Sequence, residues 1–385
     1  MFLKVSPSSQ FNGMGSVGNS LPTNDVFGFY YNPAQLGNFA KNNNFGFQFY
    51  PQKTDWQKDL GPELNNFGMS VGYKPENSLF SFGFGFLHSH FDYGTFDYTN
   101  EFGTKDEKII GPTYSYQAFS LGINYDWIID FNAGVTFKNI KGKNLLLNYN
   151  EFFIPQDTVK LKTQTFDFGI LATIPFGKIS SKSYDGKYFL NASLGFSVRN
   201  LGGSVKYPDK EESELMPRTS VLGYSLVGGY EGEINGETFD FVKLSWSVDA
   251  EDDLTKKVVV VTDGKSTLKE EYQNILANTN PWKNIILAEG SSKIIRHLGF
   301  KVELFETFSF MKGSLDGDGF DGRKTIGFGF SSKGISKYLY SKDENEIFEF
   351  LSQDVELKYF HSSFFDGSDI ESKFNGVSLV LKNIF

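Results

Sequence analysis

From residue 44 onward, apolar residues alternate with small or polar residues in short runs that are separated by polar turns. In the run 80–86, every even position is Phe, and the odd positions are Ser81, Gly83 and Gly85. Because successive side chains of a strand point to opposite faces, such a run predicts a strand with one apolar face and one crowded face. The same pattern recurs at 119–125, 129–138, 165–172, 190–199, 298–304 and 326–331.

This alternation is typical of a transmembrane antiparallel β-barrel, apolar toward lipid and small or polar toward the lumen. We count about fourteen such runs, and a less regular fifteenth lies near 144–153. Bacterial single-chain barrels have an even strand number, which favours fourteen. An open sheet in lipid would leave backbone groups unpaired, so the sheet is expected to close. A large soluble β-sandwich or solenoid would also alternate, but its solvent face would carry Lys, Glu and Thr.

Three stretches stand apart from the barrel pattern. Residues 1–43 are rich in Gly, Asn, Ser and Pro and do not alternate, so the predicted barrel covers 44–385. The stretch 250–295 begins in an acidic region and is predicted to be a long loop. Within it, Thr267 and Glu270 have the spacing of a capping box, which predicts a short helix. The polar stretch 339–353 is predicted to be an extramembrane loop.

Composition supports the barrel and excludes several alternatives. The 385 residues include 42 Phe and 40 Gly, as expected for a large sheet with one apolar and one crowded face. Mean hydropathy is -0.30, and the absence of a run of about 18 apolar residues excludes a spanning helix. Without Cys there is neither a disulfide nor a thiol nucleophile. A net charge of -9 disfavours binding to nucleic acid.

Both ends of the chain bear on export. Lys4 is followed directly by Val5, Ser6 and Pro7 without an apolar signal core, and we interpret the chain as a mature one whose signal peptide has been removed. The predicted last strand ends on the aromatic Phe385. Outer-membrane barrels commonly end this way, so Phe385 is our candidate assembly signal.

Two motifs suggest enzymes but lack the required context. Residues 13–18 fit G-x-G-x-x-G, yet no strand precedes them and no helix is expected after them, so we predict a glycine-dependent turn. Residues 68–72 fit G-x-S-x-G within an alternating strand, where no nucleophile elbow forms. We therefore predict no enzyme activity and no cofactor.

Metal binding is also weakly indicated. His88 and His90 share a strand face but lie near its end, where interfacial histidines are the simpler interpretation. Asp316, Asp318 and Asp321 lie among glycines and resemble a calcium loop, although the third Asp is one place late. A Gly- and Asp-rich hairpin turn is the preferred prediction, and these three residues remain a calcium candidate.

The N-terminal stretch resembles the opening of the FadL superfamily, nearest to its PorV/PorQ branch of type IX secretion barrels. The similar positions, in order, are Phe2-Leu3, Pro7, Gly13-Met14-Gly15, Gly18, Asp25 and Tyr31-Asn32-Pro33-Ala34-Gln35-Leu36. Two later segments are similar as well, 194–202 with 215–218 and 296–303 through 327–329. The resemblance implies a fourteen-stranded barrel whose residues 1–43 fold inward as a hatch, with Gly13, Gly15, Gly18, Asn32, Pro33 and Ala34 as hatch residues.

The resemblance further implies an outer-membrane location and one of two roles. By similarity to PorV, the barrel would recognise C-terminal domains of secreted cargo and dock on a large translocon barrel. By similarity to FadL, it would instead take up long-chain fatty acids or other hydrophobic small molecules. The motifs favour the secretion role, with the lipid bilayer as a partner in either case.

Overall fold

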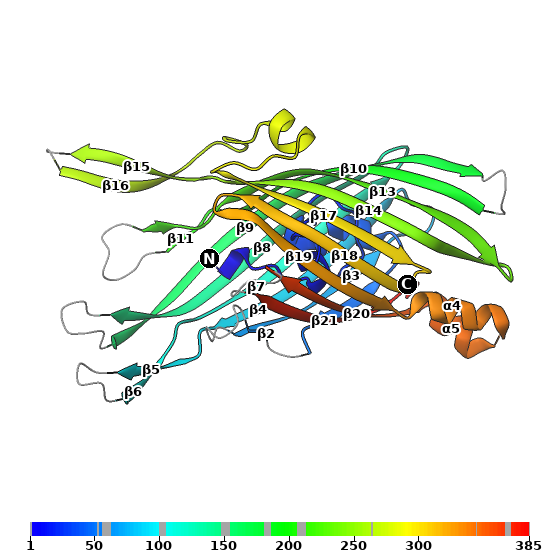
Figure 1. Cartoon of the computed structure of the whole chain (residues 1–385), viewed down its shortest axis with the longest axis horizontal. Coiled ribbons are helices and arrows are strands. Elements are labelled where there is room, and N and C mark those ends of the chain that lie inside the picture. The colour runs from blue at the N-terminus through cyan, green and yellow to red at the C-terminus, as the bar shows by residue number, and fades with distance from the viewer. Residues whose placement is uncertain are drawn as a thin grey trace.

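A computed structural model describes residues 2–51, 54–55, 63–99, 105–147, 155–180, 186–205, 213–262, 265–343, 345–365 and 371–384. Within these ranges, fourteen strands form one closed antiparallel barrel (Figure 1), which confirms the predicted fold class. Each barrel strand pairs with the next one along the chain, and β1 pairs with both β3 and β21, which closes the ring. The strands are β1 (Phe45–Phe49), β3 (Glu63–Tyr73), β4 (Phe80–Asp92), β7 (Thr113–Asp126), β8 (Asp130–Leu147), β9 (Pro155–Ser180), β10 (Gly186–Leu201), β13 (Thr219–Ile234), β14 (Glu237–Asp253), β17 (Ile294–Leu304), β18 (Phe308–Gly317), β19 (Phe320–Ser331), β20 (Val355–Phe364) and β21 (Ser372–Leu381). Short β2 (Thr54–Asp55) pairs with β3 beyond the end of β1.

The alternating pattern places apolar side chains outside and small ones inside. In β4, Ser81 is buried in the lumen, whereas Phe80 and Phe82 are exposed on the outer face. Leu121 of β7 is 60% exposed. A barrel in water would not expose so many large apolar residues, whereas lipid stabilises them. We call this outer apolar surface the belt. In the described part of the chain, no helix is long and apolar enough to cross a membrane.

The two ends of the barrel differ (Figure 1). At the short-turn end, tight connections such as 126–130, 234–237 and 304–308 join the strands. At the long-loop end, three connections carry separate two-stranded hairpins. In outer-membrane barrels, short turns face the periplasm and longer loops face outward, which orients this barrel. The hairpins are β5 (Thr95–Thr99) with β6 (Lys105–Ile110), β11 (Ser204–Val205) with β12 (Glu214–Leu215), and β15 (Thr255–Thr262) with β16 (Lys265–Tyr272).

The 250–295 stretch differs from the prediction. Its first residues still belong to β14, which extends to Asp253. The helix predicted at Thr267 is wrong, because Thr267 lies in β16 opposite Val260. Four consecutive valines in β15 favour a strand. The segment that contains Thr267 pairs with them as β16 of the same hairpin. The helical segment of this stretch is η2 (Pro281–Ile286), further along the chain.

Two other predictions, the extramembrane loop at 339–353 and the less regular run near 144–153, are also compared with the structure. The 339–353 loop is helical, with α4 (Lys333–Lys342) and α5 (Glu346–Gln353) at the short-turn end. The side chain of Asn345 caps α5 by accepting the N–H of Phe348, an N-cap type that strongly favours helix initiation. The irregular run near 144–153 is the end of β8 as far as Leu147, and 148–154 lie outside the described residues.

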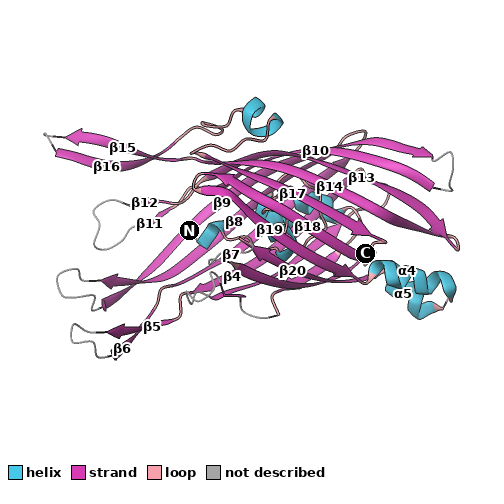
Figure 2. Cartoon of the chain, viewed as in Figure 1, coloured by secondary structure: helices cyan, strands magenta, loops and turns pink. Residues whose placement is uncertain are grey.

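Residues 2–43 lie inside the barrel, as the cyan helices enclosed by strands in Figure 2 show. We call them the plug. They form η1 (Phe2–Lys4), α1 (Ser9–Asn12), α2 (Gly28–Tyr31) and α3 (Gln35–Ala40). Helix α1 contacts β19, β20 and β21, whereas α3 contacts β3, β4, β7 and β8. The plug therefore spans the lumen from one side of the wall to the other.

Candidate functional site

The plug backbone approaches the barrel wall at inward-facing glycines. A Cβ atom on Gly313 would lie 2.1 Å from the backbone N of Gly15, and one on Gly195 would lie 2.3 Å from the carbonyl O of Asn19. Only glycine permits contacts this close. The wall is therefore shaped to hold the plug. Eleven wall glycines, from ten strands, have plug atoms nearest to the missing side chain: Gly46, Gly72, Gly83, Gly85, Gly122, Gly134, Gly169, Gly195, Gly299, Gly313 and Gly376.

Gly13 and Gly15, the first two predicted hatch residues, contact the neighbouring strands β17, β18 and β19. Gly13 packs on Gly327 of β19, where an added Cβ would lie 3.1 Å from its Cα. Gly15 has φ of +68° and donates its N–H to Thr325 Oγ1 at 2.8 Å. Its carbonyl O lies 2.8 Å from Nδ1 of His297. The G-x-G-x-x-G segment thus forms a tight turn against the wall.

Asn32 holds the second predicted group in place. Its side-chain Nδ2 donates to the carbonyl O of Ile170 in β9 and to that of Asn19, both at 2.9 Å. Its Oδ1 accepts the N–H of Ala34 at 3.0 Å. Pro33 lies between them, and its carbonyl O is the atom nearest to the missing side chain of Gly134. Asn32 therefore joins two plug segments to the wall through one buried amide.

Asp249 is a further plug contact that sequence reasoning missed. Its carboxylate accepts the N–H groups of Gly18 and Asn19, each at 3.0 Å, and the Ser20 hydroxyl at 2.8 Å. The acidic region was predicted to begin a loop, but Asp249 lies inside the barrel in β14. The parity of Ser245, Ser247 and Asp249 was the signal that would have located it on the inner face.

Charged side chains are buried in the lumen beside the plug. Lys138 and Asp167 form an ion pair at 2.7 Å, and both side chains are almost fully buried. Asn200 completes the group by accepting from Lys138 Nζ at 3.0 Å. The alternation over 129–138 places Lys138 on the inner face, but no local pattern indicates its partner. This pair fixes β8 to β9 within the lumen.

The plug's N-terminal segment is held by a second charged group. Lys4 Nζ lies 3.0 Å from Asp253 and 3.8 Å from Glu251. Burial would lower the pKa of Lys4, but the two carboxylates outweigh it and raise that pKa above the ordinary value. The Tyr30 hydroxyl donates to the carbonyl O of Leu3 at 2.9 Å. The segment Phe2–Val5 is thus fixed at the long-loop end (Figure 1).

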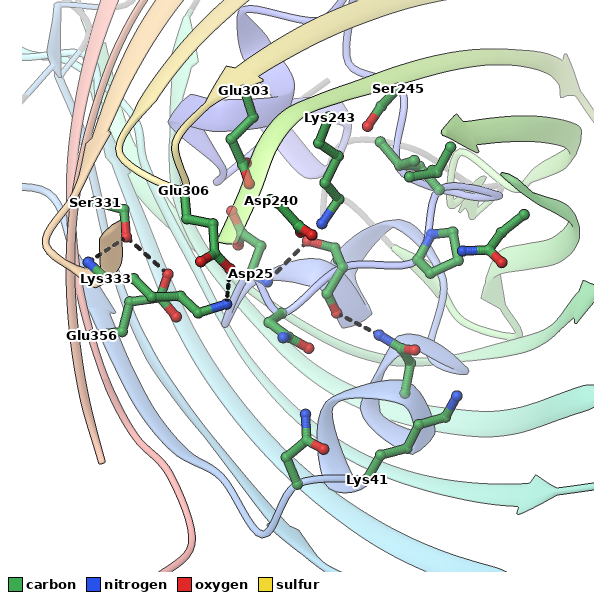
Figure 3. Close-up of a pocket in the computed structure, with 18 of the residues that line it drawn as sticks. Asp25, Lys41, Asp240, Lys243, Ser245, Glu303, Glu306, Ser331, Lys333 and Glu356 are labelled. Carbon is green, nitrogen blue, oxygen red and sulfur yellow. Dashed lines mark hydrogen bonds and ion pairs between the residues drawn. The ribbon is translucent and has the colours of Figure 1, made fainter. Parts of the chain in front are cut away.

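Below the plug, at the short-turn end, lies a cavity of about 1080 Å³ that we call the vestibule. In Figure 3, Glu303, Glu306, Glu356, Lys243 and Lys333 surround it together with Asp25 of the plug. Its lining includes nine carboxylates and eight lysines, so it is charged but nearly neutral. The carboxylates are those of Asp25, Asp126, Asp130, Glu231, Glu237, Asp240, Glu303, Glu306 and Glu356, and the lysines are Lys41, Lys178, Lys243, Lys301, Lys333, Lys337, Lys358 and Lys382.

Most vestibule charges are paired with an opposite charge in the same strand, in the next strand along or in helix α4. Glu356 lies 3.1 Å from Lys382 and 3.2 Å from Lys358. Glu306, in the β17–β18 turn, lies 2.8 Å from Lys337 and also pairs with Lys333. Burial would raise the pKa of Glu306, but the two lysines outweigh burial and lower it. These pairs stabilise a water-accessible, polar chamber.

On the long-loop side, the lumen is filled by an apolar cluster. Leu3, Val5 and Phe11 of the plug belong to it. So do inward-facing wall residues, which are Leu64, Leu87, Phe91, Tyr116, Ile140, Ile295, Leu315, Phe364 and Phe374. The long-loop side of the lumen therefore combines a large apolar cluster with a few paired charges, whereas the vestibule at the short-turn end is lined mainly by charged and polar residues.

The G-x-S-x-G motif and the metal candidate His88 both lie in barrel strands. Ser70, the central residue of G-x-S-x-G, lies in β3 and donates its hydroxyl to the carbonyl O of Val26 in the plug at 3.0 Å. His88, a metal candidate, packs with its ring centre 5.3 Å from that of Phe67 on the outer side of β4. The Ser70 hydroxyl thus contributes to plug binding.

The calcium candidates lie in the β18–β19 hairpin. Asp316 is in β18, Asp318 is in the turn with φ of +48°, and Asp321 is in β19. Among the described side chains, no three acidic or His groups come together as a metal site. The hairpin places all three residues in or beside its turn. Phe385, the candidate assembly signal, lies outside the described residues.

Comparisons with known proteins find only distant structural likeness. No family model and no curated protein matches the chain. The Pseudomonas putida toluene transporter TodX is similar over 97% of this chain and 96% of its own, with 12% identity and a TM-score of 0.46. A Pseudomonas aeruginosa FadL homologue is similar over 98% of both chains, with 10% identity and a TM-score of 0.43. These values assign neither a family nor a ligand. The fold and the site define a plugged transmembrane β-barrel of the outer-membrane type.

Proposed function

We propose that this protein is an outer-membrane barrel that admits small apolar compounds from its long-loop end, with the plug as its gate. The observation that carries the proposal is the change in the lumen from an apolar cluster to a charged vestibule. A general porin would keep a polar lining throughout. An apolar compound gains free energy by leaving water for an apolar site.

The gating element of the proposal is the segment Phe2–Val5. Leu3 and Val5 occupy the apolar cluster, so a bound compound would take their place. Its polar attachments are the hydrogen bond from Tyr30 to Leu3 and the ion pairs of Lys4, whose side chain is 31% exposed. A partly exposed ion pair contributes little to stability, so the cost of releasing the segment lies mainly in Leu3 and Val5, whose places in the apolar cluster the bound compound would fill.

The proposal is tested by binding of a long-chain fatty acid and of toluene, the compound transported by TodX, to the purified protein in detergent. Lys4→Ala should bind several-fold more tightly than wild type, because the closed state competes less with the ligand. Lys256→Ala, on the exposed hairpin β15, is the matched control and should leave affinity unchanged. Absence of binding by wild type and Lys4→Ala alike would reject the proposal.

A second candidate is the secretion role implied by the resemblance to the PorV/PorQ branch. The three hairpins at the long-loop end favour it (Figure 1). In the described pairings, each is a sheet of two strands only, so its backbone edges are available to a partner strand. A mild-detergent pull-down from native membranes separates the two candidates. A large barrel with secreted proteins sharing a C-terminal domain supports secretion, whereas a lone barrel carrying an apolar molecule supports uptake.

A further inference from the structure

The two helices at the short-turn end carry apolar stripes that nothing in the described structure covers. We call residues 333–353 the helical hairpin. In each helix the exposed apolar residues have the spacing i, i+3, i+4, which places them on one face. Ile347 is 70% exposed and Phe350 is 54% exposed. The stripes are Ile335, Tyr338 and Leu339 in α4, and Ile347, Phe350 and Leu351 in α5.

The opposite face of α4 is fixed to the barrel. Lys337 Nζ donates to the carbonyl O of Thr238 at 2.7 Å and to Glu306 at 2.8 Å. Gly334 packs against the carbonyl O of Phe305 so closely that a Cβ would not fit. Near the end of α4, Asn235 Nδ2 donates to the carbonyl O of Ser341. The helical hairpin is therefore held in a defined orientation with its apolar stripes turned away from these contacts.

The helical hairpin continues the outer surface of the barrel. Phe239 pairs with Gly232, two residues from Tyr230, and Tyr230 pairs with Val242 of the belt. Phe239 therefore lies on the outer face, yet it is only 2% exposed, and Lys337 of α4 lies over its ring. Helix α4 thus lies on the rim of the barrel, where it covers Phe239 on the outer face while Lys333 and Lys337 reach the vestibule. Where the helical hairpin joins β19 and β20, the neighbouring outward residues Phe328 and Leu357 belong to the belt.

We propose that the helical hairpin docks into the lipid headgroup region at the short-turn end and anchors this rim of the barrel in the membrane. Amphipathic helices bind there by burying an apolar face at the boundary between headgroups and acyl chains. Residues 333–353 carry three lysines and four acidic residues, so the charge predicts binding to zwitterionic lipid without a need for anionic lipid. The inference rests on the membrane location in the proposed function and not on the compound transported.

The absence of cysteine allows single labels to test this contact. Ile347→Cys and Phe350→Cys would carry an environment-sensitive fluorophore, with folding verified by heat-modifiable migration on gels. Phe310→Cys in the belt is the positive control, and Glu349→Cys on the exposed polar face of α5 is the matched control. In zwitterionic phosphatidylcholine vesicles with brominated acyl chains, labels at 347 and 350 should lose emission roughly twofold, as an interfacial helix would. The label at 349 should keep its emission.

Two results would overturn the inference, and they differ from each other. If the belt label is quenched but labels at 347 and 350 are not, the helical hairpin does not contact lipid. Iodide access to those labels would then indicate water, and protection from iodide would indicate a protein partner or a second copy. If the belt label is also unquenched, the membrane barrel itself is rejected, and the proposed function with it.

Discussion

The carboxylate of Asp249 in β14 accepts the backbone N–H of Asn19 in the plug at 3.0 Å. The two residues are 230 positions apart, and the same carboxylate accepts the N–H of Gly18 and the hydroxyl of Ser20. Buried hydrogen bonds to a charged group are among the stronger ones in proteins. This contact therefore determines how firmly the plug is seated, and it leads to the first prediction.

Asp249→Ala should loosen the plug, because three buried plug donors lose their acceptor. We expect a loss of about 3 kcal/mol of stability. In planar bilayers, the variant should show a higher leak conductance than wild type. Glu349→Ala, on the exposed surface of α5, is a control that should change neither quantity. Wild-type conductance and melting in Asp249→Ala would contradict the role assigned to Asp249.

Gly313→Ala should displace the plug, since the new Cβ would lie 2.1 Å from the backbone N of Gly15. Overpacking of this kind costs about 1–3 kcal/mol. Gly228→Ala is the matched control, because its Cβ meets only wall atoms, the nearest at 3.2 Å. Thermal unfolding in detergent should therefore fall for the first variant and stay near wild type for the second. Equal melting of the two variants would argue against a wall shaped to the plug.

Asn32→Ala should also weaken the plug, because the backbone N–H of Ala34 and two carbonyl groups lose their buried partner. Unsatisfied buried groups cost about 1–3 kcal/mol. The measurement is unfolding temperature together with pore conductance. Replacing Asn32 and Pro33 together should add little, because Pro33 contributes its backbone rather than a polar side chain. Unchanged conductance and stability in both variants would count against a seated plug.

Lys138→Met should destabilise the barrel strongly, since it leaves the carboxylate of Asp167 buried without its cation. Breaking a buried ion pair on one side costs about 3–5 kcal/mol. The double variant with Asp167→Leu should recover much of that loss, because no uncompensated charge remains. A double-mutant cycle on unfolding free energy measures the coupling. Additive losses in the cycle would mean that the two side chains do not act as a pair.

Attachment of the helical hairpin should depend on pH through Glu306. Lys333 and Lys337 lower the pKa of Glu306 in the folded protein, despite its burial. A lowered folded pKa contributes stability above the ordinary carboxyl pKa, and this contribution is lost as pH falls through the lowered value. A fluorophore on Ser341→Cys should therefore gain mobility only in acid. Glu306→Gln should show the mobile state at neutral pH as well, and an acid transition retained in that variant would assign it to another group.

The alternating pattern predicted the barrel strands because successive side chains of a strand face lipid and lumen in turn. Each environment therefore selects the residue type at every second position. Runs such as 80–86 and 119–125 correspond to β4 and β7 with the expected faces. Helices α4 and α5 and the hairpin β15–β16 were missed or wrongly assigned. Outside the membrane, a local signal such as the capping box at Thr267 competes with strand pairing. Here Thr267 pairs with the valine-rich strand β15, so the segment is a strand and not a helix.

By itself, the sequence determined the fold class, the strand number, the inward position of small residues and the separate character of residues 1–43. Only the tertiary structure decided where the plug binds. Gly195 meets Asn19, and Asp249 meets Gly18, through contacts between residues far apart in the chain. The same holds for the charged vestibule, whose lysines and carboxylates come from many strands. Periodicity indicates which face of the sheet a residue occupies. The residue that it contacts across the closed lumen depends on strand order and register, which no local sequence pattern encodes.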